Sequence, residues 1–223
     1  MSMAELLRTL APDRITRSVW VVVDPRDAVT GARVTAPLDV RLRRLEARPI
    51  FARSGVYCFT DLSVPAAKYI VDVEPRAEAA AAYFRAEREF TLKVPGGATP
   101  PLDRNAVTVE LLPRPAYPFG DRVSTARGRL VRRSNGAPIA DAAIDLVRTG
   151  DPTLRRGRTD ERGDFVVALP PEPAGDGSAV ATATKLAFRL EFTVPGHPPH
   201  RTAEQQVDEG RAVSLGLVPF PTL

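Results

Sequence analysis

Two histidines, His197 and His200, lie three residues apart and are the side chains best suited to bind a transition metal. Together with a carboxylate such as Glu204 they could supply three ligands. The two prolines between them favour a loop, however, and the neighbouring sequence adds neither thiols nor a cluster of carboxylates. We therefore interpret the GHPPH segment as an exposed turn, and predict no metal site and no cofactor.

Cys58 is the only cysteine, so the chain cannot form an internal disulfide and nothing in its cysteine content requires an oxidising compartment. It stands between Tyr57 and Phe59 in an alternating apolar run, which places it on the opposite face of a strand. The sequence also lacks the Gly-x-Ser-x-Gly pattern that exposes a nucleophilic serine. We predict no catalytic residue and a protein that is not an enzyme.

Arginine supplies nearly all of the positive charge, and its side chains bind carboxylates and phosphates through paired hydrogen bonds. Three clusters stand out: Arg41, Arg43 and Arg44; Arg129, Arg132 and Arg133; and Arg155, Arg156 and Arg158. Acidic residues are interleaved with them, the net charge is only +4, and no aromatic residues alternate with them to stack on bases. Nucleic acid is therefore disfavoured as a ligand. We assign Arg132, Arg133, Arg155, Arg156 and Arg158 to a protein-facing surface.

The stretch from Arg53 to Glu74 shows which elements position these side chains. Apolar residues alternate twice in it, before and after a corner at Pro65: Tyr57 and Phe59, then Tyr69, Val71 and Val73. A period of two is typical of a strand with one buried face. The stretch therefore predicts two strands joined by a turn, with Tyr57 and Phe59 in a core.

The rest of the first half shows the same kind of pattern. Strands are predicted after Ser18, over 34–42, over 84–94 and over 107–111, and the Ala-rich segment 76–82 predicts one or two turns of helix. The 22 prolines and 15 glycines stand in short clusters, which favours many short strands. We expect Gly31 to close the turn after the first strand with a positive φ.

The second half repeats this order at an offset of about 100 to 108 residues. Four matches carry the repeat: 126–147 with 19–42, 159–169 with the strand at Tyr57, 188–196 with 84–96, and 210–221 with 104–115. We predict an all-β fold of two tandem antiparallel β-sandwiches, with Phe165 and Phe192 in the second core. The predicted boundaries are an arm or short helix at 1–17, repeat 1 at 18–115, a proline-rich linker at 116–119 and repeat 2 at 120–223.

The second repeat resembles the carboxypeptidase regulatory-like domain, a transthyretin-like (prealbumin-like) sandwich. The matching residues are Gly136, Pro138, Ile139 and Ala142, followed by Thr159, Asp160, Gly163 and Phe165. The first repeat departs from this pattern, because Arg33 replaces the proline and Phe51-Ala52 replaces the Thr-Asp pair. Such domains are usually accessory modules, so the resemblance implies a fold and no peptidase activity.

The first 17 residues contain a short apolar stripe, Leu6, Leu7 and Leu10, which Pro12 ends. A helix of two turns is marginal alone, so this arm either packs on the body of the protein or binds a partner. The chain has no apolar run of membrane-spanning length and no signal-peptide pattern at its start. We expect a cytoplasmic protein, or a component of an exported or released particle.

These observations favour a non-enzymatic structural or protein-interaction module, a subunit or adaptor of a larger assembly. A phage-tail-like or secretion apparatus is one such setting. Its partners would be other proteins, which it would bind through edge strands, arginine-rich loops and the arm. The alternative is a sandwich that binds a carbohydrate or another small ligand through loops at one end. The single tryptophan, Trp20, lies in an apolar strand and argues against an aromatic sugar platform.

Overall fold

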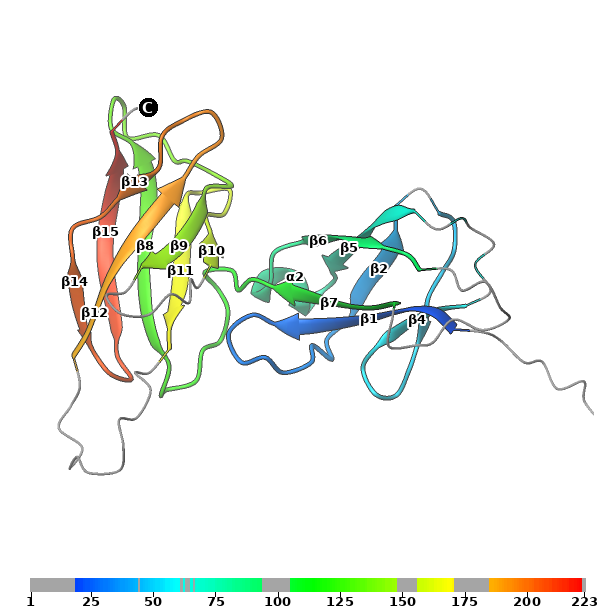
Figure 1. The fold of residues 1–223 in the computed structure, drawn as a ribbon. Coiled ribbons are helices and arrows are strands. Elements are labelled where there is room, and N and C mark those ends of the chain that lie inside the picture. The colour runs from blue at the N-terminus through cyan, green and yellow to red at the C-terminus, as the bar shows by residue number, and fades with distance from the viewer. Residues whose placement is uncertain are drawn as a thin grey trace, which may run out of the picture.

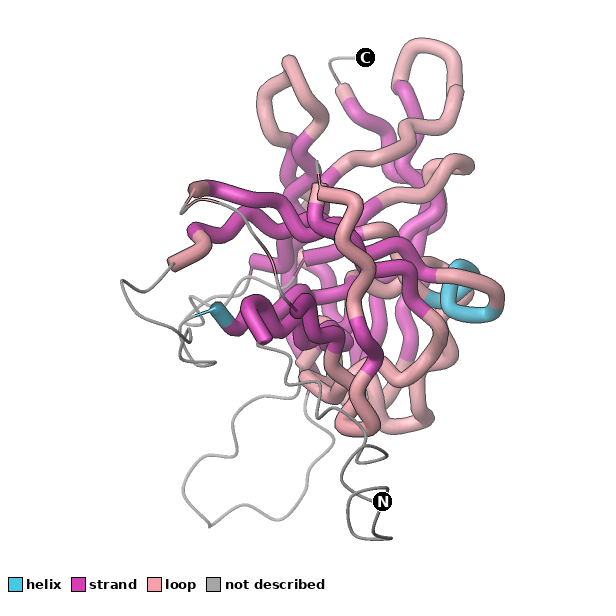
Figure 2. Tube along the Cα trace, turned by 90° about the vertical axis from the view of Figure 1, so that its right-hand side faces the viewer, coloured by secondary structure: helices cyan, strands magenta, loops and turns pink. Residues whose placement is uncertain are grey.

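The structure is a computed structural model that describes residues 19–43, 45–60, 62, 65, 67–93, 105–147, 156–170 and 185–221. Within these residues the regular secondary structure is almost entirely β-strand, with one short helix (Figure 1). The view turned by 90° shows the same dominance of strands (Figure 2). The all-β prediction is confirmed. No helix in the described part of the chain is long and apolar enough to cross a membrane.

The first half, residues 19–111, forms two sheets. Its elements are β1 (Val19–Asp27), β2 (Leu38–Leu42), β3 (Ile50–Phe51), β4 (Tyr57–Thr60), β5 (Lys68–Pro75), α2 (Glu78–Ala82), β6 (Ala86–Thr91) and β7 (Ala106–Leu111). One sheet has the order β3-β4-β1-β7 and the other β2-β5-β6. Inward side chains of both sheets, among them Phe59, Leu42 and Val71, form one buried cluster. The predicted core positions Tyr57 and Phe59 are confirmed.

The second half, residues 124–221, is built in the same way. Its strands are β8 (Ser124–Arg132), β9 (Ala143–Val147), β10 (Arg156–Arg158), β11 (Asp164–Leu169), β12 (Lys185–Thr193), β13 (His200–Arg201), β14 (Gln205–Asp208) and β15 (Ala212–Phe220). One sheet has the order β11-β8-β15; the other has the order β10-β9-β12-β13, with β14 also pairing with β12. Phe165 and Phe192 lie in its buried cluster, as predicted, and this cluster shares no residue with the first.

The two halves pair their strands alike. In each half the first strand lies between an antiparallel neighbour and the last strand, which runs parallel to it: β4 and β7 flank β1, and β11 and β15 flank β8. Tyr57 lies opposite Val23, and Phe165 lies opposite Gly128. Each of these partners precedes a hairpin glycine by eight residues. Tyr57 and Phe165 therefore occupy equivalent places.

Two details of the sequence-based prediction are wrong. The sheets are not purely antiparallel, because the first and last strands of each half run parallel. The match of 188–196 with 84–96 also fails: β12 pairs with β9 as β5 pairs with β2, so Phe192 corresponds to Val73 and not to Phe90. Both segments alternate with the same period of two, and alternation alone does not say which neighbour a strand pairs with.

The Thr-Asp-x-x-Gly turn before β11 has the structural role that its sequence indicates. Asp160 Oδ1 accepts the backbone N–H groups of Arg162 and Asp164, each at 2.9 Å. The hydroxyl of buried Thr159 accepts the N–H of Ala142 at 2.9 Å. Gly163 has a φ of 75°, and a Cβ at this position would lie 2.5 Å from the carbonyl oxygen of Leu130. The turn therefore fixes β11 against β8.

Candidate functional site

The arginines and leucines assigned to a partner surface do not form one cluster. Arg132 and Arg133 lie exposed at the hairpin after β8, beside the end of β15, where the N–H of Arg133 bonds the carbonyl of Phe220. Arg158 lies instead at the junction between the halves and forms a 2.8 Å ion pair with Asp141. Arg156 is part of β10, but its side chain is outside the described set, as are Leu6, Leu7, Leu10 and Arg155.

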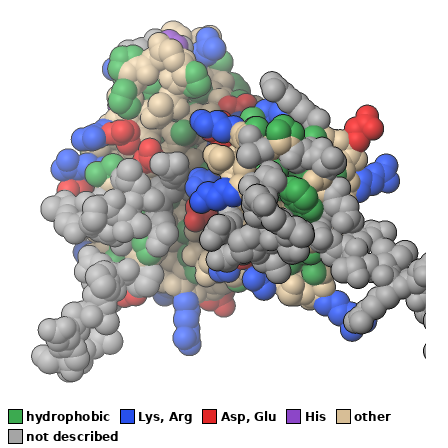
Figure 3. Space-filling view, turned by 45° about the vertical axis from the view of Figure 1, so that its right-hand side comes forward, with side chains coloured by type: hydrophobic (Ala, Val, Ile, Leu, Met, Phe, Trp, Pro, Cys, Tyr) green, Lys and Arg blue, Asp and Glu red, His purple; other side chains and the backbone are tan. Residues whose placement is uncertain are grey.

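Opposite charges alternate on the surface (Figure 3). Arg129 forms a bidentate pair with Asp164, at 2.6 and 3.0 Å. Arg41 and Arg76 both bond Asp39, and Arg85 bonds Asp72. Among the described residues, charges paired in this way break up the basic surface that nucleic-acid binding would need.

The two histidines are half-buried. Their rings meet the ring of Phe220 edge-on, with centroids 6.2 Å away for His197 and 5.8 Å for His200. The nearby carboxylate of Glu204 accepts a hydrogen bond from Arg189. Within the described residues no group of three or more His, Cys, Asp and Glu side chains could hold a metal ion. Gly196, Pro198 and Pro199 are exposed, as expected for an exposed turn, whereas the two histidine rings pack on the end of β15.

A buried polar cluster joins the first half to the connecting segment. It centres on Asp27, at the end of β1, which is 4% exposed. Its Oδ1 accepts the N–H groups of Val29 and Thr30 at 2.7 and 2.9 Å. Its Oδ2 accepts the hydroxyls of Tyr83, at 2.8 Å, and of Tyr117. Four donors thus converge on one carboxylate.

Electrostatics keep Asp27 ionised. Burial alone would raise the pKa of this carboxyl, but hydrogen bonds from the Tyr117 hydroxyl, the Thr30 N–H and the Tyr83 hydroxyl outweigh it and lower the pKa below 3.8. The pKa of each tyrosine is raised in turn, by burial and by the bond that it donates to the anion. Both hydroxyls therefore stay protonated as donors. The tyrosine rings also meet edge-on, with centroids 5.4 Å apart.

The connecting segment, residues 112–123, is bound to both halves. Its Arg114 donates its N–H to the carbonyl of Ala82 in the first half and pairs with Glu161 of the second at 2.6 Å. In the second half Arg127 donates to the carbonyl of Pro115 at 3.0 Å, and its guanidinium lies over the ring of Phe119. The segment is therefore anchored by side chains on each side, in addition to the stiffness that its prolines predict.

Phe84 provides a contact between the two halves. Its buried ring has the guanidinium of Arg114 at 4.9 Å from its centroid and that of Arg158, from β10, at 5.8 Å. Cations over an aromatic face are attracted by its negative potential. Beside this contact a cleft of about 730 Å³ opens between the halves.

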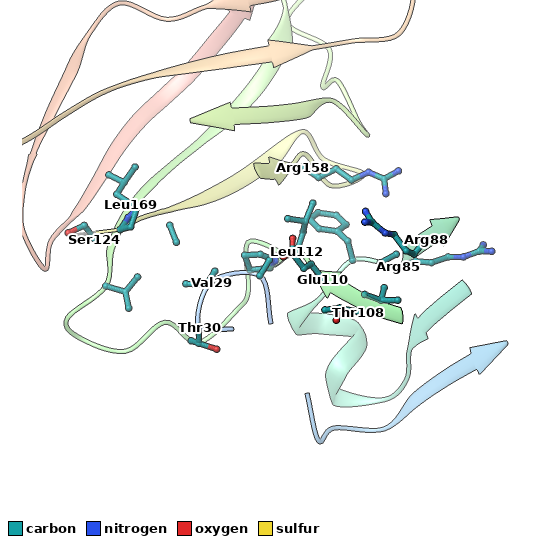
Figure 4. A pocket seen from close by; sticks show the side chains of 18 of the residues that line it. Val29, Thr30, Arg85, Arg88, Thr108, Glu110, Leu112, Ser124, Arg158 and Leu169 are labelled. Atoms are coloured by element: carbon teal, nitrogen blue, oxygen red, sulfur yellow. The ribbon is translucent and has the colours of Figure 1, made fainter. Parts of the chain in front are cut away.

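The cleft is lined from both halves (Figure 4). The labelled Arg85, Arg88 and Arg158 lie toward one side of it, and Ser124 and Leu169 lie toward the other. Acidic Glu87, Glu110 and Glu209 are interleaved with the arginines of the lining.

Among the described residues that line the cleft there is neither His nor Cys, and Glu87, Glu110 and Glu209 are the carboxylates. Its serine, Ser124, is 2% exposed, and its hydroxyl accepts the N–H of Gly210 at 2.8 Å. Cys58 lies elsewhere, half-buried on the outward face of β4, where burial raises the pKa of its thiol and so disfavours the nucleophilic thiolate.

Sequence reasoning missed Asp27, Tyr83 and Tyr117. The bonds from Asp27 to the next turn follow a local pattern in which Asp accepts N–H groups two and three residues on, and this part could be predicted. The two tyrosines are 56 and 90 residues away in the chain. Nothing in their local sequence indicates that they meet one carboxylate.

Comparison with known proteins gives distant structural likenesses only. No protein-family model and no curated protein sequence matches the chain significantly. Similar solved structures include the Bacillus anthracis TIE protein, with 15% identity, a TM-score of 0.31 and a match that covers 91% of this chain and 34% of that one. Another is (S)-allantoin synthase, with 16% identity, a TM-score of 0.31 and a match that covers 47% of this chain and 43% of that one. A third is the shaft pilin spaA from Lactobacillus rhamnosus GG, with 13% identity, a TM-score of 0.28 and a match that covers 93% of this chain and 100% of that one. The chain spans less than half the length of the first two, and likenesses this weak identify no function.

Replacing Tyr117 by phenylalanine is expected to loosen the junction. The change removes one donor to the buried Asp27 carboxylate and keeps the ring, and hydrogen bonds to charged groups contribute about 1.5–3 kcal/mol. We expect a loss of that size in the free energy of unfolding of the first half, measured by urea denaturation with Trp20 fluorescence. Tyr69→Phe is the control, because its hydroxyl bonds the Pro65 carbonyl at an exposed site. Equal losses in the two variants would contradict the role given to Tyr117.

Proposed function

We propose that the chain is a non-enzymatic structural or adaptor subunit of a larger protein assembly. It consists of two transthyretin-like β-sandwiches in tandem, residues 18–115 and 120–223, the second of the carboxypeptidase regulatory-like type. The proposal is supported by the equivalent strand pairing of the two halves. It is also supported by the hydrogen bonds from Tyr83 and Tyr117 to Asp27, which hold the connecting segment on the first half. We place the subunit in the cytoplasm or in a particle released from the cell.

The observation that carries the proposal is the open edge of β15. Within the described residues this nine-residue strand pairs on one side only, with β8, and contains no charged residue. Leu217 on it is 68% exposed. Exposed edges offer unpaired backbone groups to a second chain, and proteins usually protect them with charges. A bulge at Gly216 and a proline at Pro219 interrupt this edge, which favours a short and specific strand pairing over open-ended aggregation.

Arginines flank this edge. Arg132 and Arg133 lie next to the C-terminal end of β15, at the point where β8 ends and its hairpin turn begins. Guanidinium groups at one end of an apolar strand edge suit a protein partner that offers an extended strand with a carboxylate beside it.

Cross-linking mass spectrometry on full-length chain in extract of its source cell, together with light scattering of the purified chain, tests this function. We expect a partner cross-linked around β15, and a Leu217→Lys variant that recovers at least tenfold less of it. Ala140→Lys, at an exposed loop position of the same half, should recover the wild-type amount. A monomer without any partner, or equal recovery by both variants, would contradict the proposal.

The cleft favours one alternative, a small-ligand module. Arg88 and Arg122 in its lining are exposed, and arginines beside an aromatic ring suit a carboxylated sugar or another small anion. Calorimetric titration of the purified chain with uronic-acid oligosaccharides and polycarboxylates tests it. Binding that Arg88→Ala abolishes, in a chain that is monomeric and finds no partner, would reverse the order of the two functions.

A further inference from the structure

The two outward faces of the first half differ in chemistry. The outward face of the β2-β5-β6 sheet is covered with paired charges, such as Arg41 with Asp39 and Arg85 with Asp72. The outward face of the β3-β4-β1-β7 sheet has an uncharged row across all four strands, in which neighbours face each other in register: Ile50, Cys58, Val22 and Ala106. Ile50 is 44% exposed, and Cys58 and Val22 are half-buried. This apolar row is uncovered by the described residues.

The corresponding place in the second half is covered. The equivalent partners are Val23–Tyr57 in the first half and Gly128–Phe165 in the second. The next pair along the strands is Val22–Cys58 in the first half and Arg127–Val166 in the second, so these two pairs correspond. Val166 is 0% exposed although it points away from the core that Phe165 and Val167 enter.

The segment that leads into the first strand of that half contacts this face at Arg127. Arg127, directly opposite Val166, donates to the carbonyl of Pro115 and lies over the ring of Phe119. Both belong to the residues just before β8. In the second half, therefore, the chain that precedes the first strand folds back across the outward face of its sheet.

We propose that residues 1–18 cover the apolar row of the first half in the same way, with Leu6, Leu7 and Leu10 as the contacting side chains. These residues lead into β1 as residues 112–123 lead into β8. Leu10 is nine residues before Val19, and nine extended residues span roughly 30 Å. The row at Val22 lies only three residues, about 10 Å, along the strand from Val19. The segment has the length to fold back and the apolar stripe to match, and the occupant is the chain's own N-terminal segment.

Cys58 reports on this cover, because it is the only thiol in the chain and stands in the middle of the row. The test is the rate at which N-ethylmaleimide alkylates Cys58 in the folded full-length chain, followed by mass spectrometry. Replacing Leu6, Leu7 and Leu10 by aspartate should raise this rate at least tenfold over wild type. A control with Ser2, Thr9 and Thr16 replaced by aspartate adds the same charge, keeps the leucines, and should keep the wild-type rate.

The outcomes separate the possible occupants. A wild-type rate that is slow and independent of protein concentration supports the chain's own segment. A rate that slows as the concentration rises, with dimers by light scattering, overturns it in favour of a segment exchanged with a second copy. If the leucine variant keeps both the wild-type alkylation rate of Cys58 and the wild-type urea midpoint, the proposal is overturned. The leucines would then be free to bind another protein.

Discussion

Replacing Phe165 by alanine is expected to lower the free energy of unfolding of the second half by about 3 to 5 kcal/mol. The ring is 1% exposed and meets the ring of Phe192 edge-on, with centroids 5.2 Å apart. Its partner on the neighbouring strand is Gly128, where an added Cβ would lie 2.8 Å from the Phe165 ring. The ring therefore lies directly over that glycine, and alanine at position 165 would leave this space empty. A loss of this size is a large part of the 5–15 kcal/mol that stabilises a typical domain.

Urea denaturation followed by two signals would check this result. Trp20 is the only tryptophan and lies in the first half, whereas far-ultraviolet circular dichroism reports the strands of both halves. We expect the dichroism transition to move to lower urea much more than the fluorescence transition. Phe51→Ala is the control, because that ring is 54% exposed and its loss should cost below about 1 kcal/mol. A Phe165 variant no less stable than the Phe51 variant would contradict the core assignment.

Among the glycines that the structure describes, Gly163 should be the one whose replacement by alanine is most damaging. Gly136 has nearly the same backbone, with a φ of 70° against 75°, so both alanine variants incur a left-handed conformation that costs about 1–2 kcal/mol. Only Gly163 adds a clash: its new Cβ would lie 2.5 Å from the Leu130 carbonyl oxygen, whereas nothing lies within 4 Å of the one at Gly136. We expect Gly163→Ala to be less stable than Gly136→Ala by a further 1–3 kcal/mol or so.

The difference between these two variants, measured by urea denaturation, isolates the clash from the backbone cost. It matters because Gly163 lets the turn approach β8 and so sets the register of β11, on which the burial of Phe165 depends. Equal stability of the two alanine variants would mean that the turn moves away freely, and that close packing of the turn on β8 is not what fixes the strand.

Local alternation was sufficient to predict strands such as β1, β4 and β11 and the core residues on them, but not the short strands β3, β10, β13 and β14. The period of two predicted the buried positions of Tyr57, Phe59, Phe165 and Phe192. Successive side chains of a strand point to opposite faces, so a strand with one solvent-exposed face buries only every second residue. The turn at Asp160 and Gly163 was predictable for a similar reason, since its bonds join residues close in the chain.

What the sequence did not predict depends on contacts between distant residues. The parallel pairing of first and last strands, and the pairing of β12 with β9, are choices among partners that the same alternation allows. The Asp27 cluster joins residues from three separate segments, and neither tyrosine differs locally from an ordinary surface tyrosine. Arg158 and Arg132 were grouped by composition, yet one contacts the first half and the other lies at the hairpin after β8.

We propose that the two equivalent β units are held as one rigid body by the junction at Asp27, Tyr117 and Phe84. Nitrogen-15 relaxation of backbone amides in the full-length chain tests it most directly, because each half reports its own rotational correlation time. We predict a single correlation time shared by residues 19–111 and 124–221, which separates into two shorter ones in a Tyr117→Phe, Arg114→Ala double variant. Two different, shorter times in the wild-type chain would contradict the claim.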